Sequence, residues 1–150
     1  MNLKTIITTA ALACAANLSA QWTYETIDNG FDGKFKIAIC QDGQGNFAKL
    51  YGGQGEPLGL LLYTGYNCFE RPKVEVILLI NGQWVKYETV GLNSSDSKKV
   101  YIFDDIRGSE ANWKAATEMR IRHDDDHCGT RIYTFSMKGS TAAFDFMVAR

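Results

Sequence analysis

An Asn-Gly dipeptide in the middle of the chain constrains the fold more than any other feature. Asn81 and Gly82 separate two strand-like runs, 74–80 and 84–90. An Asn-Gly in this setting is the strongest short-range signal of a β-hairpin, because both residues tolerate the positive φ angles of a tight turn. The sequence therefore predicts that these two runs pair as antiparallel strands.

The rest of the chain repeats this pattern of short strands and turns. The run 58–63 is apolar on both faces and is typical of a central buried strand. Further strand-like runs occur at 22–27, 35–39, 47–51, 100–103, 119–122 and 131–137. About eight or nine short strands favour an all-β fold, a single antiparallel β-sandwich or flattened barrel. One short helix is expected near 109–117, where Ser109 can cap the first turn.

The N-terminal residues have the order of a secretory signal peptide. Lys4 supplies a positive charge, residues 6–16 are almost all apolar or small, and Leu18-Ser19-Ala20 offers an aliphatic and a small residue for signal peptidase. The apolar run is about half as long as the span of ~20 residues that crosses a membrane. We expect a cleaved signal peptide over 1–20 and a single β-sandwich domain over 21–150.

A lipoprotein signal is the alternative interpretation of the same region. Ala11-Leu12-Ala13-Cys14 places an aliphatic residue before a cysteine that could be acylated, although the two lie one position too close together. With the signal peptide cleaved, we expect the mature protein to be secreted or periplasmic.

The charge of the chain disfavours some classes of partner. The formal net charge is −1 at pH 7, and losing the single positive charge of Lys4 takes it to −2. Binding to nucleic acid or to anionic membranes depends on clusters of basic residues, and no such cluster occurs. We expect no nucleic-acid partner and no membrane span in the mature chain.

Three cysteines remain once Cys14 leaves with the signal peptide. Cys40 lies inside a strand-like segment, which suits a small packed side chain. Cys68 and Cys128 lie beside polar turn residues, and an odd number in an exported protein implies one bridge and one free thiol. We predict a Cys68–Cys128 disulfide that stabilises the fold by about 4 kcal/mol on the chain-entropy model.

The densest cluster of metal-binding residue types is the acidic tip, residues 123–127. Imidazoles and carboxylates are ligands that zinc and other divalent ions select, so His123, Asp125 and His127 form a candidate metal site. Alternate residues of a strand point to opposite faces, so the two imidazoles converge only if the tip folds back. A bridged Cys128 could not join them. The alternative is an acidic, solvated loop between two strands.

No arrangement of residues typical of an enzyme occurs in the chain. Gly-x-Ser-x-Gly and His-Glu-x-x-His are absent from the sequence, and both histidines lie in the acidic tip. We therefore assign no catalytic residues and no resident cofactor beyond a divalent metal at the tip, and a small hydrolase stays an alternative. The glycines within 43–55 lack the lysine and following helix of a phosphate loop. We expect flexible connections there, with a ligand rim as the alternative.

Aromatic residues near these glycines indicate a binding surface. Tyr51, Tyr63, Tyr66 and Phe69 lie close in sequence, and tyrosines at the loop-rich end of a sandwich are common recognition anchors. The alternative is that half of them line the core. The leading hypothesis is a binding or structural module of the bacterial envelope or extracellular space, with a protein or glycan partner. The alternative is a metal-binding protein or small metal-dependent enzyme centred on 123–127.

The end of the chain resembles a known family. The segment Phe135-Ser136-Met137-Lys138-Gly139-Ser140-Thr141-Ala142-Ala143-Phe144 carries a glycine, a hydroxyl residue and a pair of alanines. It is similar to the closing strand and turn of small exported bacterial β-sandwich proteins of the invasion-associated locus B type. The resemblance covers about ten residues and implies a secreted sandwich with envelope or host-facing duties. It carries over no site residues.

Overall fold

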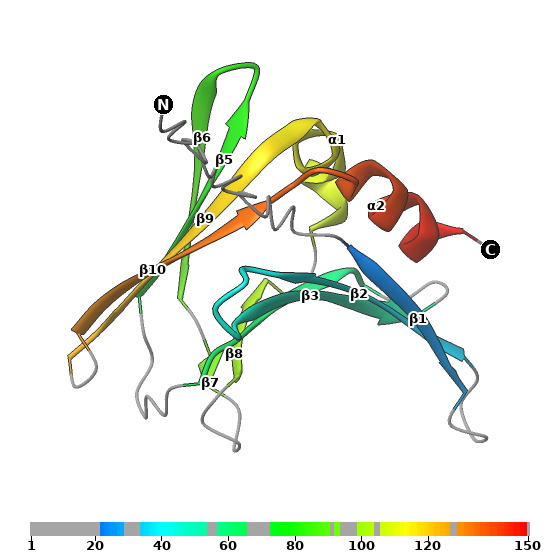
Figure 1. The fold of residues 1–150 in the computed structure, drawn as a ribbon, viewed down its shortest axis with the longest axis horizontal. Coiled ribbons are helices and arrows are strands. Elements are labelled where there is room, and N and C mark those ends of the chain that lie inside the picture. The colour runs from blue at the N-terminus through cyan, green and yellow to red at the C-terminus, as the bar shows by residue number, and fades with distance from the viewer. Residues whose placement is uncertain are drawn as a thin grey trace, which may run out of the picture.

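Two antiparallel β-sheets, one of six strands and one of four, make up most of the computed structural model (Figure 1). The structure describes residues 22–28, 34–53, 57–65, 73–90, 92–93, 99–103, 106–126 and 129–149. The six-stranded sheet has the order β1 (Thr23–Asp28), β2 (Lys34–Gln41), β3 (Phe47–Gly53), β4 (Gly59–Tyr63), β8 (Lys99–Phe103) and β7 (Leu92–Asn93). The four-stranded sheet has the order β10 (Gly129–Ser136), β9 (Ala116–Asp125), β5 (Lys73–Ile80) and β6 (Gln83–Val90). The all-β prediction is confirmed.

Local turn chemistry explains the β5–β6 hairpin. Asn81 and Gly82 have φ angles of 50° and 78°, so both adopt the left-handed conformation that a two-residue hairpin turn needs. Ile80 pairs directly with Gln83 across the turn, and the register continues without a break to Lys73 and Val90. The hairpin predicted from the sequence is therefore present.

The core lies between the inner sides of the two sheets. The predicted central strand β4 pairs with β3 and β8 and is buried over most of its length. The six-stranded sheet contributes Ala38, Cys40, Ala48, Leu50, Leu60 and Leu62 to the core. The four-stranded sheet contributes Val74, Val76, Leu78, Met119, Ile121, Tyr133 and Phe135. Alternate residues of each strand thus point into the core, and the residues between them lie on the outer sides of the two sheets.

Two short helices fill the space where the sheets diverge (Figure 1). The first, α1 (Glu110–Ala115), follows a 3₁₀ turn, η1 (Arg107–Ser109), and occupies the region predicted to be helical. Ser109 does not cap it through its side chain. The Ser109 hydroxyl instead donates to the carbonyl of Ile106 at 3.2 Å and accepts from Nε1 of Trp113 at 2.8 Å. The predicted cap is wrong because the indole and the preceding turn use this hydroxyl.

The second helix, α2 (Ser140–Val148), was not predicted from the sequence. Gly139 begins the segment with a φ of 88°, and the hydroxyl of Ser140 donates to the carbonyl of Trp113 at 3.2 Å. Thr141 donates to the carbonyl of Lys114 at 3.2 Å, so α2 satisfies carbonyls at the end of α1 that have no partner within that helix. The segment that resembles a closing strand and turn is thus a strand end, a turn and a helix.

Lys36 of β2 fixes the far end of α2. Its ammonium donates to the carbonyls of Phe146 at 2.9 Å and Ala149 at 2.6 Å, and it lies 5.2 Å from the centre of the Phe146 ring. A cation is favourable at a helix C-terminus, where carbonyl groups point outward. The Tyr24 ring contacts Phe146 at a centroid distance of 5.4 Å. The second strand of the chain therefore holds its last helix in place.

The predicted signal peptide, residues 1–20, lies outside the described residues and stays a prediction. Within the described ranges, none of the helices has the length and apolar character that crossing a membrane requires.

Candidate functional site

Tyr51 of β3 and Tyr63 of β4 lie on the same side of the six-stranded sheet. The residues that precede them, Leu50 and Leu62, are 1% and 0% exposed in the core. Successive strand residues point to opposite faces, so both tyrosines face the outer side. Each tyrosine is half buried. The structure thus places two of the four residues predicted to form a binding surface on the same side of the sheet, at the two ends of the β3–β4 pairing.

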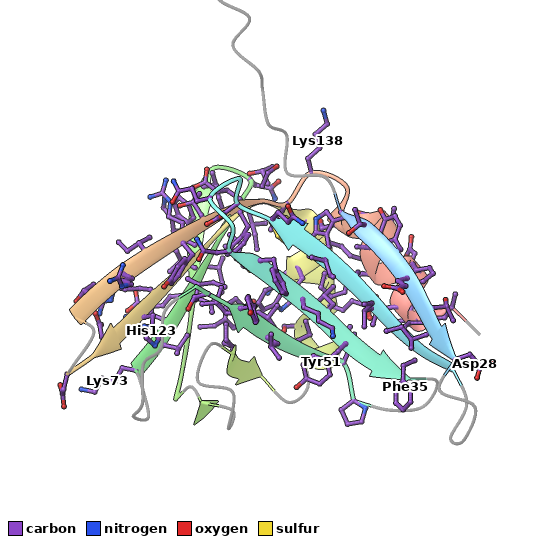
Figure 2. The ribbon with its side chains drawn as sticks, turned by 60° about the horizontal axis from the view of Figure 1, so that its bottom comes forward. Asp28, Phe35, Tyr51, Lys73, His123 and Lys138 are labelled. Atoms are coloured by element: carbon purple, nitrogen blue, oxygen red, sulfur yellow. The ribbon has the colours of Figure 1, made fainter. Side chains whose placement is uncertain are left out.

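Further apolar side chains extend this outer side. The Phe47 ring stacks on Tyr63 with ring centres 4.5 Å apart and an angle of 9° between the planes. Ile27 of β1 and Phe35 of β2 are cross-strand partners and are 40% and 39% exposed. We call Ile27, Phe35, Phe47, Tyr51 and Tyr63 the aromatic face. Figure 2 brings this side of the molecule forward and labels Phe35 and Tyr51 on neighbouring strands.

The aromatic face rests on side chains that are themselves well packed. Ile37 of β2 and Leu61 of β4 lie on the same outer side as the aromatic face, yet they are only 8% and 6% exposed. Such support limits the rotamer freedom that a binding partner would otherwise have to remove. Tyr66 and Phe69, the other two predicted members, lie outside the described residues.

A glycine seats one of the aromatic rings. Gly59 of β4 pairs with Tyr51 of β3, and the Tyr51 ring lies directly over it. A Cβ atom at position 59 would stand 2.3 Å from Cζ of Tyr51, so any other residue would displace the ring. The sequence shows this glycine, but only the register between β3 and β4 reveals its contact with the tyrosine.

The outer side of the four-stranded sheet has a different character. Asp124 accepts from Arg122 at 2.9 Å, Arg122 lies 3.6 Å from Glu75, and Glu75 pairs with Lys86 at 3.0 Å. These four residues form a ladder of opposite charges across three strands. Exposed pairs of this kind add little stability individually, but they make a surface that water solvates well.

Hydrogen bonding completes this charged surface. The hydroxyl of Thr130 donates to Asp124 at 2.6 Å, and this bond, followed by the charge of Arg122, holds the pKa of Asp124 below its ordinary value. The guanidinium of Arg120 lies 4.6 Å from the ring centre of Trp84, which it partly covers. Even the exposed tryptophan on this side therefore has a cationic neighbour.

The predicted metal site is only partly described. His123 lies on the inner side of β9 and is 2% exposed, so it is part of the packed strand and not of a solvated loop. Asp124, the next residue, bonds to Thr130 and Arg122 on the outer side. Asp125 ends β9, and His127 lies outside the described residues. Within the part of the chain that the structure describes, no three His, Cys, Asp or Glu residues could hold a metal ion. The metal site stays a prediction.

Cys40 behaves as the packed side chain that the sequence predicts. It is free and 0% exposed, and its thiol donates to the carbonyl of Ser136 in β10 at 3.3 Å. Burial, with a smaller contribution from the negative charge of Asp42, raises the pKa of this thiol to about 12. Cys68 and Cys128 lie outside the described residues, so their disulfide stays a prediction.

We expect Cys40 to resist alkylation in the folded protein. The thiolate is the reactive species, and a pKa of about 12 leaves almost none of it at pH 8. Iodoacetamide at pH 8 should label Cys40 only after denaturation, as peptide mass spectrometry would detect. Rapid labelling of Cys40 in native buffer would contradict its burial between β2 and β10.

A cavity of about 570 Å³ lies between the β2–β3 turn and strand β10. It is lined by Gln44, Gly45, Asn46, Gly65, Arg131, Ile132 and Tyr133. Asp42 holds the turn, because its carboxylate accepts from the backbone N–H of Gln44 at 2.7 Å and from the Asn46 side chain at 2.6 Å. Gly45 has a φ of 91° within this turn, so one glycine of the glycine-rich segment does form part of a cavity rim.

Comparisons of the chain with protein-family models, with curated proteins and with solved structures find no match.

Proposed function

We propose that this protein is an exported binding module that contacts a protein or glycan partner through the aromatic face. The N-terminal sequence supports export. The absence of a catalytic constellation in the sequence supports binding in place of chemistry. The aromatic face supports the choice of surface, because it presents half-buried tyrosines and exposed apolar side chains on a regular sheet.

One observation carries the proposal, the difference between the outer sides of the two sheets. The four-stranded sheet presents charges that neutralise each other along Asp124, Arg122, Glu75 and Lys86, with two separate exposed apolar side chains, Trp84 beside Arg120 and Ile132 on the edge strand. The six-stranded sheet presents the aromatic face, and Figure 1 shows both helices and the other sheet on its opposite side. Exposed apolar side chains gathered on one side of a sheet mark interaction sites in proteins, and tyrosine anchors bind at a low cost in conformational entropy.

The proposal is tested by comparing matched variants of the two outer sides. The double variant Phe35→Ser, Tyr51→Ser removes two rings from the aromatic face, and Trp84→Ser removes one ring from the charged sheet. Each protein is immobilised and challenged with separate polysaccharide and protein fractions of a bacterial envelope. We expect the wild type and Trp84→Ser to retain the same component and the double variant to lose at least about 90% of it, because rings anchor such interfaces.

Circular dichroism and urea unfolding of all three proteins establish that they are folded before the comparison. Equal retention by all three would contradict the assignment of the aromatic face. Retention by none of them, from either fraction, would count against a binding role in the envelope.

A further inference from the structure

Strand β10 leaves one backbone edge open in the four-stranded sheet. Among the strands that the structure describes, it is the terminal one of this sheet and pairs only with β9. The N–H of Met137 donates to the carbonyl of Thr117 at 3.0 Å, which continues the β9–β10 ladder past Ser136. Hydrogen-bonded pairs recur at every second residue of an antiparallel ladder, so Arg131, Tyr133 and Phe135 bond to β9. The N–H and C=O groups of the alternate residues 130, 132 and 134 point away from β9.

This edge lacks the features with which proteins protect exposed strands. Its register with β9 runs without a bulge from Gly129 to Ser136, and the strand contains no proline. Its one charged residue, Arg131, is half buried. Ile132 is 62% exposed, more than any other large apolar side chain described. By contrast, the opposite edge strand β6 carries Lys86 in the charge ladder. Unprotected edges pair readily with another strand.

The length of the open stretch determines which residues of an added strand would lie opposite those of β10. At one end the thiol of Cys40 donates to the carbonyl of Ser136, so β2 closes the edge there. The open stretch therefore runs over Gly129–Phe135, and Ile132 is its midpoint. The outer side chains have the same order in both directions from Ile132, because the exposed threonines Thr130 and Thr134 flank it at equal distances. A strand with such a pattern is complementary to itself when it runs antiparallel.

We infer that a second copy of this chain pairs with β10 about a two-fold axis through Ile132. The two Ile132 residues exchange backbone hydrogen bonds and cover each other's side chain on the outer side. Thr130 lies opposite Thr134 of the second copy, a favourable cross-strand pair. Arg131 lies opposite Tyr133 of the second copy, so no like charges meet.

The inference is tested by the oligomeric state of the full chain, purified from a host that exports it. Sedimentation velocity across a concentration series should show a monomer–dimer equilibrium. Ile132→Lys places two like charges at the axis and should raise the dissociation constant at least about 100-fold. Val148→Lys, at a side chain that is 43% exposed on α2, is the matched control and should leave the dissociation constant unchanged.

Amide hydrogen exchange locates the contact. The N–H of Ile132 should be protected at high concentration and exchange rapidly on dilution, whereas the N–H of Tyr133, which bonds to β9, should stay protected at both. A monomer at every concentration would overturn the inference. So would a dimer that persists in Ile132→Lys, or a peptide from another protein bound at this edge. None of these results bears on the aromatic face, which lies on the other sheet.

Discussion

Replacing Trp113 with alanine is expected to lower the free energy of unfolding by about 3 to 5 kcal/mol, the range for large aromatic side chains removed from a core. Trp113 is 1% exposed and stands where α1, α2 and the four-stranded sheet meet. Its ring centre lies 5.8 Å from that of Tyr87 and 6.5 Å from that of Phe144. Its indole N–H also donates to Ser109. Alanine would leave a cavity and remove the indole donor to that hydroxyl.

Urea unfolding followed by far-ultraviolet circular dichroism measures this loss without relying on tryptophan fluorescence. Trp84→Ala is the matched control, because Trp84 is 43% exposed and contacts Arg120 over its ring. Loss of that exposed contact should cost about 0.5 to 1 kcal/mol. If the two variants lost equal stability, Trp113 would not be the side chain that joins the helices to the sheet.

Two glycine substitutions should separate stability from binding. Gly52→Ala is expected to destabilise the fold by about 1 to 3 kcal/mol, the usual cost of overpacking. A Cβ atom there would stand 2.7 Å from the backbone carbonyl oxygen of Pro57, which cannot move without shifting the chain. Gly59→Ala meets the end of the Tyr51 side chain instead, and that ring can rotate away. We expect a smaller loss of stability from Gly59→Ala but weaker partner binding, because the aromatic face loses the seated ring.

Thermal and urea unfolding of both variants measure the first effect, and near-ultraviolet circular dichroism reports the displaced tyrosine. Retention of the envelope component measures the second effect. A Gly59→Ala protein that binds as well as the wild type would show that the Tyr51 ring position does not matter to the partner. A Gly52→Ala protein as stable as the wild type would show that the backbone carbonyl of Pro57 can shift to accommodate the added Cβ atom.

The parts of the fold that sequence reasoning predicts are those with local causes. The Asn81-Gly82 turn, the alternation in β2 and the apolar run of β4 each depend on residues that are neighbours in the chain. The helix α2 was missed because the contacts that stabilise it come from residues distant in the sequence. Its nine residues are too few to form a stable helix alone, and contacts with α1 and Lys36 hold its two ends.

The candidate binding surface was predicted only in part, because residue type and proximity in the chain identify some of its members but not all. Tyr51 and Tyr63 were identified from residue type and proximity, and the β3–β4 pairing places them on the same side of the sheet, opposite Gly59 and Phe47. Ile27 and Phe35 were missed, because alternation with polar residues in β1 and β2 indicates a core-facing side, whereas both side chains are exposed in the structure. Which strands are neighbours, and which one forms an edge, follows from topology. The open edge of β10 could not be read from the chain alone.

The bonds from Lys36 to the last helix join residues 110 and 113 positions apart. A chain made from its N-terminus forms β2 long before the partner of this lysine exists. Until residues 140–149 have been made, the inner side of the six-stranded sheet lacks the part of its cover that α2 supplies over β1, β2 and β3. The packing of β1, β2 and β3 is therefore complete only after residues 140–149 have been made, and deletion of these residues would affect strands that are distant from them in the sequence.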